Sequence, residues 1–256
     1  MRRNDAAERT MERFMELLVK TMREAVEMGN EETIKDFENC VRSLGVPEET
    51  AGEIATCAKE RFFRRKRNAC EAAFLIDSMT GLPGQYLYNL IFNPRKPARR
   101  KSDLFVVREF VSYVREAYPQ NELCVAFVDF AGFKKVNDEL GHEFGDFVLS
   151  EFGKRIKESG LLAFRRGGDE FLLIGDCKEM EKTEKIFEKK SPFVRKNGGR
   201  NVDAIPIFGI HRLPEGTMVP PSNFEELGHF RNIMGFHVMV AETACYDNKR
   251  KRREKR

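Results

Sequence analysis

A tight acidic turn between two apolar stretches constrains the fold of this chain more than any other feature. Residues 161–164 and 171–174 are apolar, and they flank the run Gly167-Gly168-Asp169-Glu170-Phe171. Glycine adopts the positive φ angles that a hairpin tip needs, so the run predicts a strand, a turn and a second strand. Such a turn holds two carboxylates at a fixed point. Gly-Gly-Asp is also ordinary hairpin chemistry, so the run alone leaves a purely structural role open.

A second carboxylate follows a strand upstream. Residues 123–128 are apolar without a break, which is typical of a strand covered on both faces, and Asp129 ends the run. Burying a carboxylate is costly unless it is paired or binds a metal. Asp129 and Asp169 at the ends of neighbouring strands would make an oxygen-rich Mg²⁺ site. A helix N-cap is the alternative for Asp129, because a helical segment follows.

Three motifs in this order resemble the GGDEF domain of diguanylate cyclases, which is similar in fold to the palm of nucleotidyl cyclases and some polymerases. The first motif is Asp77-Ser78-Met79-Thr80-Gly81-Leu82. The second begins at Asp129 and continues with Phe133, Lys134, Asn137, Asp138, Gly141, His142, Gly145 and Asp146. The third is Arg165-Arg166 followed by the acidic turn. The resemblance covers about residues 75–256.

The resemblance implies an α/β domain with a central, mostly antiparallel sheet flanked by helices. We expect residues 76–256 to form this GGDEF catalytic domain. Apolar residues at spacings of three and four predict that residues 1–75 form a separate all-α domain, which would serve regulation and dimerisation. Within the catalytic domain, helices are expected over 86–92, 103–118, about 144–157 and 179–190, and a strand over 204–210. Pro206 favours the start of a strand or an edge position.

The resemblance also implies an activity: two GTP molecules are condensed into cyclic di-GMP with release of pyrophosphate. Asp129 and Asp169 would bridge two Mg²⁺ (or Mn²⁺) ions, and the carbonyl of Phe130 would add a ligand. Glu170 would bind the second metal or assist deprotonation of the attacking hydroxyl, so Asp169 and Glu170 are the candidate catalytic residues. Lys134, Lys249 and Arg253 would neutralise the triphosphate, and Asn137 and Asp146 would read guanine. Because each domain holds one GTP, the active state would be a homodimer.

The sequence departs from the family pattern in several places, and these departures keep alternatives open. Ala131 replaces an aspartate, Arg252 replaces a glycine, and residues 158–161 lack the R-x-x-D motif with which the family binds its product. The first alternative is a degenerate GGDEF module that binds GTP and signals through protein contacts without turnover. The second is a nucleic-acid-binding protein that uses Arg64–Arg67, Arg95–Lys101 and the basic tail, although the interleaved glutamates argue against it. Residues 248–256 could also be a frayed basic tail.

Charge, apolar runs and cysteine spacing together indicate where in the cell the protein is expected. The chain of 256 residues has a net charge of only +4 and no stretch of 18 apolar residues, so we expect neither a membrane-spanning helix nor a membrane partner. Its N-terminus is charged and predicts no signal peptide. The six cysteines show no Cys-x-x-Cys spacing, so we expect thiols in a reducing compartment, with no disulfide and no zinc ligand. The expected location is therefore the cytoplasm.

Overall fold

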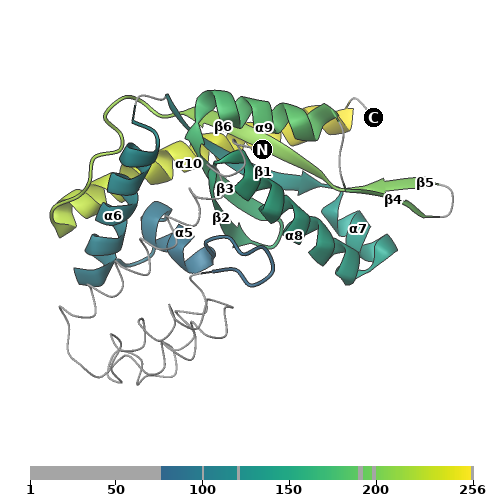
Figure 1. Ribbon diagram of the computed structural model, residues 1–256, viewed down its shortest axis with the longest axis horizontal. Coiled ribbons are helices and arrows are strands. Elements are labelled where there is room, and N and C mark those ends of the chain that lie inside the picture. The colour runs from purple at the N-terminus through teal and green to yellow at the C-terminus, as the bar shows by residue number, and fades with distance from the viewer. Residues whose placement is uncertain (1–75, 100, 120–121, 190–192, 198–199, 255–256) are drawn as a thin grey trace, which may run out of the picture.

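A computed structural model describes residues 76–99, 101–119, 122–189, 193–197 and 200–254 (Figure 1). The helical domain expected over residues 1–75, with its basic run Arg64–Arg67, lies outside these residues. The described part begins at Ile76, which forms an antiparallel bridge to Pro83.

A four-stranded antiparallel sheet forms the centre of the domain, in the strand order β2-β3-β1-β6. The strands are β1 (Leu123–Ala131), β2 (Leu162–Gly167), β3 (Glu170–Asp176) and β6 (Ile205–Arg212). The predicted antiparallel sheet is therefore confirmed, and Pro206 lies near the start of an edge strand as expected. A separate two-stranded ribbon of β4 (Val194–Asn197) and β5 (Arg200–Asp203) was not expected; it projects from one end of the body (Figure 1).

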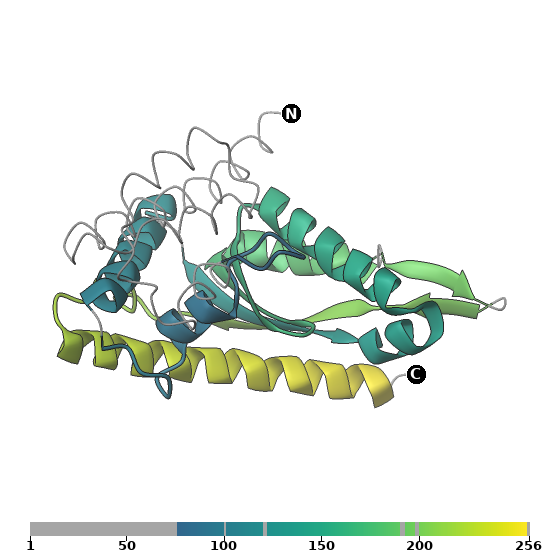
Figure 2. The same ribbon diagram turned by 90° about the horizontal axis from the view of Figure 1, so that it is seen from below.

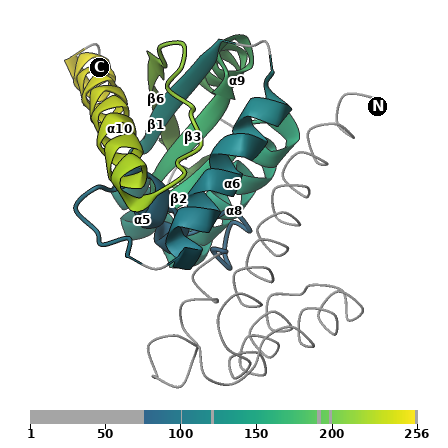
Figure 3. The ribbon, with the colours of Figure 1, turned by 90° about the vertical axis from the view of Figure 1, so that its left-hand side faces the viewer.

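Helices cover both faces of the sheet (Figures 2 and 3). On one face lie α5 (Gln85–Phe92) and the long C-terminal helix α10 (Phe224–Glu254). On the other lie α8 (His142–Ser159) and α9 (Cys177–Lys189). At opposite ends of the domain are α6 (Lys101–Ala117) and the short α7 (Phe133–Leu140) (Figure 1). The predicted helices thus exist, with ends within a few residues of those expected.

Alternation along β1 decides which side each of its residues faces. The ring of Phe130 packs edge-on against that of Phe152 on α8, with centroids 5.1 Å apart. Successive side chains of a strand point to opposite faces, so Asp129 faces the side on which α10 lies. In the antiparallel register Asp129 pairs with Glu170 of β3, and cross-strand partners share a face. Both carboxylates therefore project toward α10.

The close approach of α10 to β6 depends on Gly209. A Cβ atom at this position would lie 2.1 Å from the carbonyl oxygen of Ala241, so only glycine fits without a shift. One turn further along α10, the thiol of Cys245 donates to the carbonyl of Ile207. The helix then continues to Glu254, so the frayed-tail interpretation is wrong for residues 248–254. The basic C-terminal half of α10 is thereby held beside the polar end of β1.

A buried arginine anchors the Pro- and Arg-rich loop between α5 and α6. Arg231 of α10 is only 5% exposed, and its Nη2 donates to the carbonyls of Asn89, Asn93 and Lys96. These three acceptors span the end of α5 and the first part of the loop. The loop is therefore fastened to the same helix that carries the basic residues of the candidate site.

One cysteine pair corrects the sequence interpretation. Leu123 pairs with Asp176 in the β1–β3 register, which brings the next residues, Cys124 and Cys177, to a Cα separation of 4.9 Å, and the two form a disulfide. The expectation that all cysteines are thiols is wrong for this pair. Fifty-three positions separate the two residues, so only the strand register brings them together. Cys245 is free and buried.

Candidate functional site

The acidic turn lies at the tip of the β2–β3 hairpin, and Arg165 fixes its position. Two nitrogens of this guanidinium, Nε and Nη2, donate to the carbonyl of Gly168 at 3.0 and 2.8 Å. Its Nη1 donates to Asp77, at 2.8 Å from Oδ2, and Asp77 also accepts from the backbone N–H and hydroxyl of Thr80. The first and third motifs are therefore joined by one arginine, which holds Asp169 at a defined place.

Asp129 is the most buried carboxylate of the site, at 7% exposure. It lies inside β1, which continues to Ala131, and Gly132 takes the N-cap position of α7. The N-cap alternative for Asp129 is therefore wrong. Its Oδ2 instead lies 2.7 Å from the ammonium Nζ of Lys249 on α10. Sequence reasoning named both residues but did not pair them.

Asp169 stands next to Asp129 in a partly desolvated position. Burial, and next the charge of Asp129, raise the pKa of Asp169 to about 6. Two carboxylates this close repel each other when both are ionised. A proton, a cationic side chain or a metal cation relieves that repulsion. This pair is therefore suited to binding a hard divalent cation.

Arg166, to which the family resemblance assigns no role, lies beside Glu170. Arg166 Nη1 lies 2.9 Å from Glu242 of α10, and its Nε lies 3.7 Å from Glu170. The guanidinium also sits over the rings of Phe127 and Tyr88, with its carbon 5.2 and 5.7 Å from their centroids. Burial raises the pKa of Glu170 and the charge of Arg166 opposes that shift. Sequence reasoning missed this pair because 76 positions separate Arg166 from Glu242.

An open pocket of about 490 Å³ lies beside the acidic pair. It brings together five of the residues predicted from the sequence, from four different elements. Its lining residues are Phe130, Gly132, Phe133, Lys134, Lys135, Asp138, Glu139, Asp169, Lys249 and Arg253. Three of these, Lys134, Lys249 and Arg253, are the cations expected to hold phosphate. The pocket thus combines three carboxylates, Asp169 among them, with positive charge at its rim.

The two residues expected to read guanine lie outside that lining. Asn137 is on α7 and the exposed Asp146 is on α8. Asn137 Oδ1 is buried without a hydrogen-bond partner in the structure, and it occupies space that a side chain at position 145 would fill, since a Cβ on Gly145 would lie 1.9 Å from it. Buried polar atoms are nearly always satisfied, so an acceptor left open beside Asp146 calls for a donor.

No group of three or more His, Cys, Asp or Glu side chains suited to a metal occurs among the described residues. A cation here would therefore rest on Asp129, Asp169 and backbone oxygen. The carbonyl of Phe130, the residue after Asp129 on β1, is the candidate for that backbone oxygen. The donor set is made of hard oxygens, which suits Mg²⁺ or Mn²⁺.

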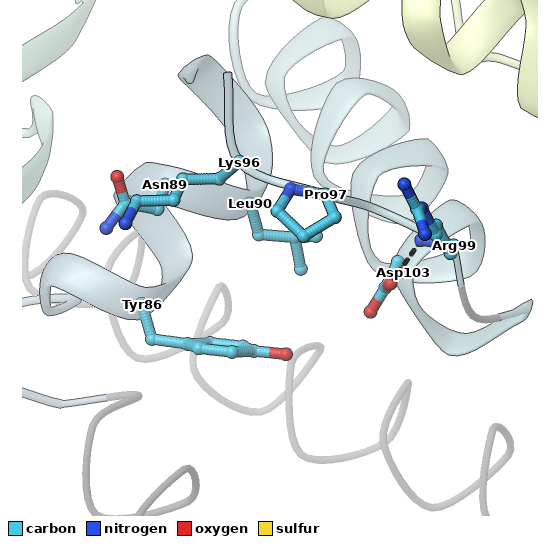
Figure 4. Close-up of a pocket in the computed structure, with 7 residues that line it drawn as sticks. All are labelled: Tyr86, Asn89, Leu90, Lys96, Pro97, Arg99 and Asp103. Carbon is cyan, nitrogen blue, oxygen red and sulfur yellow. Dashed lines mark hydrogen bonds between the residues drawn. The ribbon is translucent and has the colours of Figure 1, made fainter. Parts of the chain in front are cut away.

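A second pocket of about 420 Å³ lies away from the acidic pair, between α5, the following loop and the start of α6 (Figure 4). Asp103 at its edge accepts a hydrogen bond from the backbone N–H of Arg99 at 2.9 Å. Tyr86, Asn89, Leu90, Lys96 and Pro97 complete the lining. The pocket holds a single carboxylate and none of the residues predicted for catalysis.

The described residues form an α/β domain in which an acidic hairpin lies beside the basic end of a helix. Residues 105–199 match the family model described as diguanylate cyclase, GGDEF domain. Residues 105–199 are therefore similar to the GGDEF domain of diguanylate cyclases. Among the described residues, no helix is both long and apolar enough to cross a bilayer.

Individual relatives agree with this assignment. Diguanylate cyclase DgcS of Shewanella oneidensis is 34% identical over 104 residues, which are 39% of this chain and 29% of the relative. Diguanylate cyclase DgcP of Escherichia coli is 31% identical over 131 residues, or 48% of this chain and 33% of the relative. The matched segments thus span about a third of these relatives.

A solved structure of a sensory box/GGDEF family protein from Caulobacter crescentus aligns with 69% of this chain and 99% of its own, at 20% identity and a TM-score of 0.45.

Proposed function

We propose that this chain is a diguanylate cyclase that condenses two GTP molecules into cyclic di-GMP. In each of two steps a ribose 3′-hydroxyl attacks the α-phosphate of the other nucleotide, a P–O bond forms, and pyrophosphate leaves. The observation that carries the proposal is that the interacting charges of Asp129 and Asp169 lie beside a pocket rimmed by Lys134, Lys249 and Arg253. Phosphoryl transfer needs little from a protein beyond such placed charges.

The residues fit a divalent cation, Mg²⁺ or Mn²⁺, with two per site as the working expectation. Asp129, Asp169 and the carbonyl of Phe130 would hold it, and Glu170 would contribute to the second. When bound, such ions lower the pKa of an attacking hydroxyl and stabilise the attacking and leaving oxygens. Glu170 is the candidate acceptor for the hydroxyl proton. Lys249 would then leave Asp129 and join Lys134 and Arg253 in neutralising the triphosphate.

Base selection would depend on Asn137 and Asp146. A carboxylate can accept from the N1 and N2 donors of guanine, which adenine lacks. The unpaired acceptor on Asn137 supports a ligand that donates hydrogen bonds in this region. A site built around unpaired acceptors rejects the analogue that lacks the donors, so GTP should bind far better than ATP.

Catalysis by this route needs two domains, because each holds one GTP. We therefore propose a homodimer in the active state, with residues 1–75 as the regulatory and dimerisation domain and residues 76–256 as the catalytic domain. Deleting residues 1–70 should lower activity at low protein concentration, and activity should return at high concentration. Activity of the truncated protein that does not depend on concentration would refute this role.

Feedback through a product site before the hairpin is not expected. Gly160 follows the last turn of α8 with a φ of 79°, and Leu161 is buried at 2% exposure. Neither residue can supply the charge with which an arginine and an aspartate would bind the product. Cyclic di-GMP added to a running reaction should therefore not inhibit non-competitively at submicromolar concentration.

A second candidate is a GTP-binding module without turnover. Two ion pairs favour it: Lys249 already neutralises Asp129, and Arg166 lies near Glu170, so two of the three candidate metal-binding carboxylates have cationic partners. Metal binding must replace at least the first of these partners. If it cannot, the pocket could still bind a nucleotide.

One experiment separates the two. The purified full-length chain is incubated with GTP and Mg²⁺, the nucleotides are resolved by chromatography, and GTP and ATP binding are measured by calorimetry. Cyclic di-GMP formed by the wild type, and not by Asp169→Asn, supports the cyclase. GTP binding without any product supports the second candidate. Equal binding of GTP and ATP contradicts the role given to Asn137 and Asp146.

A further inference from the structure

The outer side of α10 carries large apolar side chains that nothing in the described structure covers. Phe236, Met239 and Tyr246 are 56%, 54% and 48% exposed. With the exposed Thr243 they follow the three-four-three spacing of a helix that packs against another helix. In Figures 2 and 3, α10 runs along the edge of the domain with the sheet on its inner side. Apolar groups gathered in this way mark an interaction surface.

The same spacing continues along α10 in both directions. Toward the N-terminus it passes through Asn232, His229 and Glu225, and toward the C-terminus it reaches Arg250, all of which are exposed. We call this set the outer stripe: residues 225, 229, 232, 236, 239, 243, 246 and 250. It is acidic at one end, apolar in the middle and basic at the other end. Such a stripe is complementary to itself when reversed.

We propose that a second copy of this chain docks on the outer stripe, with its α10 antiparallel to the first. The two-fold axis would pass midway between positions 236 and 239. Phe236 of each copy then faces Met239 of the other, which places an apolar pair on either side of the axis. The outward pairs are Asn232 with Thr243, His229 with Tyr246, and Glu225 with Arg250. The interface is therefore apolar at its centre and ion-paired at both ends.

Charge selects this arrangement over a parallel one. Two parallel copies would set Glu225 against Glu225 and Arg250 against Arg250, and like charges across a helix pair are repulsive. The antiparallel arrangement replaces both repulsions with attractions. It is also isologous, so the same patch serves both copies and the assembly closes as a dimer. An unrelated protein would need an acidic and a basic end at this same spacing, which a second copy supplies by itself.

The expected association is weak, and it is separate from catalysis. An α-helix of 31 residues is about 46 Å long, and one pair of helices buries less than the roughly 1,200 Å² of a standard interface. Lys249 lies about 17 Å along the helix from the axis, so the two candidate active sites would be about 35 Å apart along it. This contact therefore cannot be the one in which two GTP molecules meet. The inference does not depend on the proposed cyclase activity.

The first test measures self-association of the full-length chain by sedimentation equilibrium. We expect a reversible association step with a dissociation constant in the micromolar range, in addition to the dimer proposed for residues 1–75. Phe236→Glu combined with Met239→Glu should raise that constant at least tenfold. The matched control is Ile186→Glu on α9, since Ile186 is 55% exposed but lies outside the stripe, and it should leave the constant unchanged. A wild type without this micromolar step, or an equal effect of all these substitutions, overturns the proposal.

The second test fixes the orientation by exchanging charges. Glu225→Arg and Arg250→Glu should each weaken the dimer, because each places like charges across the interface. The double variant restores opposite charges at both ends, and its dissociation constant should return to within about threefold of the wild-type value. Circular dichroism of each variant checks that α10 remains helical. A double variant weaker than either single variant overturns the antiparallel arrangement, even if the apolar substitutions weaken the dimer.

Discussion

The two ends of strand β1 are held in opposite ways. At its start, Cys124 is joined covalently to Cys177, the first residue of α9. Asp129, the seventh residue of the strand, lies beside Glu170 near the other end, and its partner is the ammonium of Lys249. The first contact is permanent under oxidising conditions, whereas the second is an ion pair that another cation can replace. The disulfide thus fixes one end of β1 and helps to position the exchangeable ion pair of Asp129 near the other end. A preorganised site requires such rigid support.

The largest expected effect comes from neutralising a carboxylate at the exchangeable end. Asp169→Asn keeps the side-chain volume but removes a charge needed for a divalent cation, so turnover of GTP should fall by roughly 10³-fold or more, as for other preorganised charges in catalysis. Product formation by purified protein at equal concentration measures it. The folded fraction should not change, because an amide in place of one of two repelling carboxylates costs little.

The matched control lies at the other end of the same strand pair. Asp176 ends β3, and its Oδ1 accepts from the backbone N–H of Glu179 at the start of α9. Asp176→Asn keeps that acceptor and removes the same charge, so activity should stay near the wild-type level. Equal loss of turnover in the two variants would show that Asp169 acts through general electrostatics rather than at the site.

The next effect tests the fixed end. Replacing Cys124 and Cys177 together by alanine should lower the free energy of unfolding by about 2–4 kcal/mol, because the open loop regains conformational freedom in the unfolded chain. Urea unfolding with and without a reductant measures it. Reductant should destabilise the wild type by a similar amount and leave the double variant unaffected. A wild-type midpoint that does not respond to reductant would show that the disulfide is not formed in solution.

The sequence predicted the strands themselves but not the contacts that hold the two ends of β1. The continuous apolar run before Asp129 and the glycines of the hairpin are local signals, and they correctly predicted β1 and the β2–β3 hairpin with its turn. The disulfide and the contact of Lys249 with Asp129 join residues 53 and 120 positions apart. Strand register and the packing of α10 create these contacts, and neither leaves a local pattern. The resemblance named Lys249 and Asp129 but not the bond between them.

The β4–β5 ribbon was also not predicted, because it too lacks a local sequence signal. Its strands Val194–Asn197 and Arg200–Asp203 are short and mostly polar, and they lack the apolar alternation by which strands are recognised. Arg166 was missed for a different reason. It occupies a position without a family role, and only the approach of Glu242 on α10 gives it one.

A smaller effect is expected from Arg166, which lies beside Glu170 near the exchangeable end of β1. Arg166→Met removes the ion pair with Glu242 and the contacts with the Tyr88 and Phe127 rings, so we expect a loss of about 1–2 kcal/mol in the free energy of unfolding. Glu242→Gln should cost less, and the double variant should cost no more than Arg166→Met alone. If the arginine also positions Glu170, both single variants should weaken Mg²⁺ binding measured by calorimetry. Additive losses of stability with unchanged Mg²⁺ binding would refute that coupling.

The smallest expected effect concerns pH. Burial and the neighbouring Asp129 raise the pKa of Asp169 to about 6, above its ordinary value of 3.8. A raised pKa means that the fold favours the protonated form, so this contribution to stability is complete below pH 4 and is lost as the pH rises through 6. Asp169→Asn is neutral throughout and lacks this loss. Relative to the wild type, the variant should therefore gain stability between pH 4 and pH 7, by at most about 1 kcal/mol because solvent screens a partly exposed group.

Thermal unfolding of both proteins without metal, at several pH values, tests this. Adding Mg²⁺ at pH 7.5 should raise the unfolding temperature of the wild type more than that of the variant, because the ion binds the ionised carboxylates that otherwise repel each other. Parallel pH profiles would show that Asp169 titrates normally and that the two carboxylates are not in contact. The exchangeable end of β1 would then be an ordinary hydrated surface, and its contrast with the disulfide end would rest on Lys249 alone.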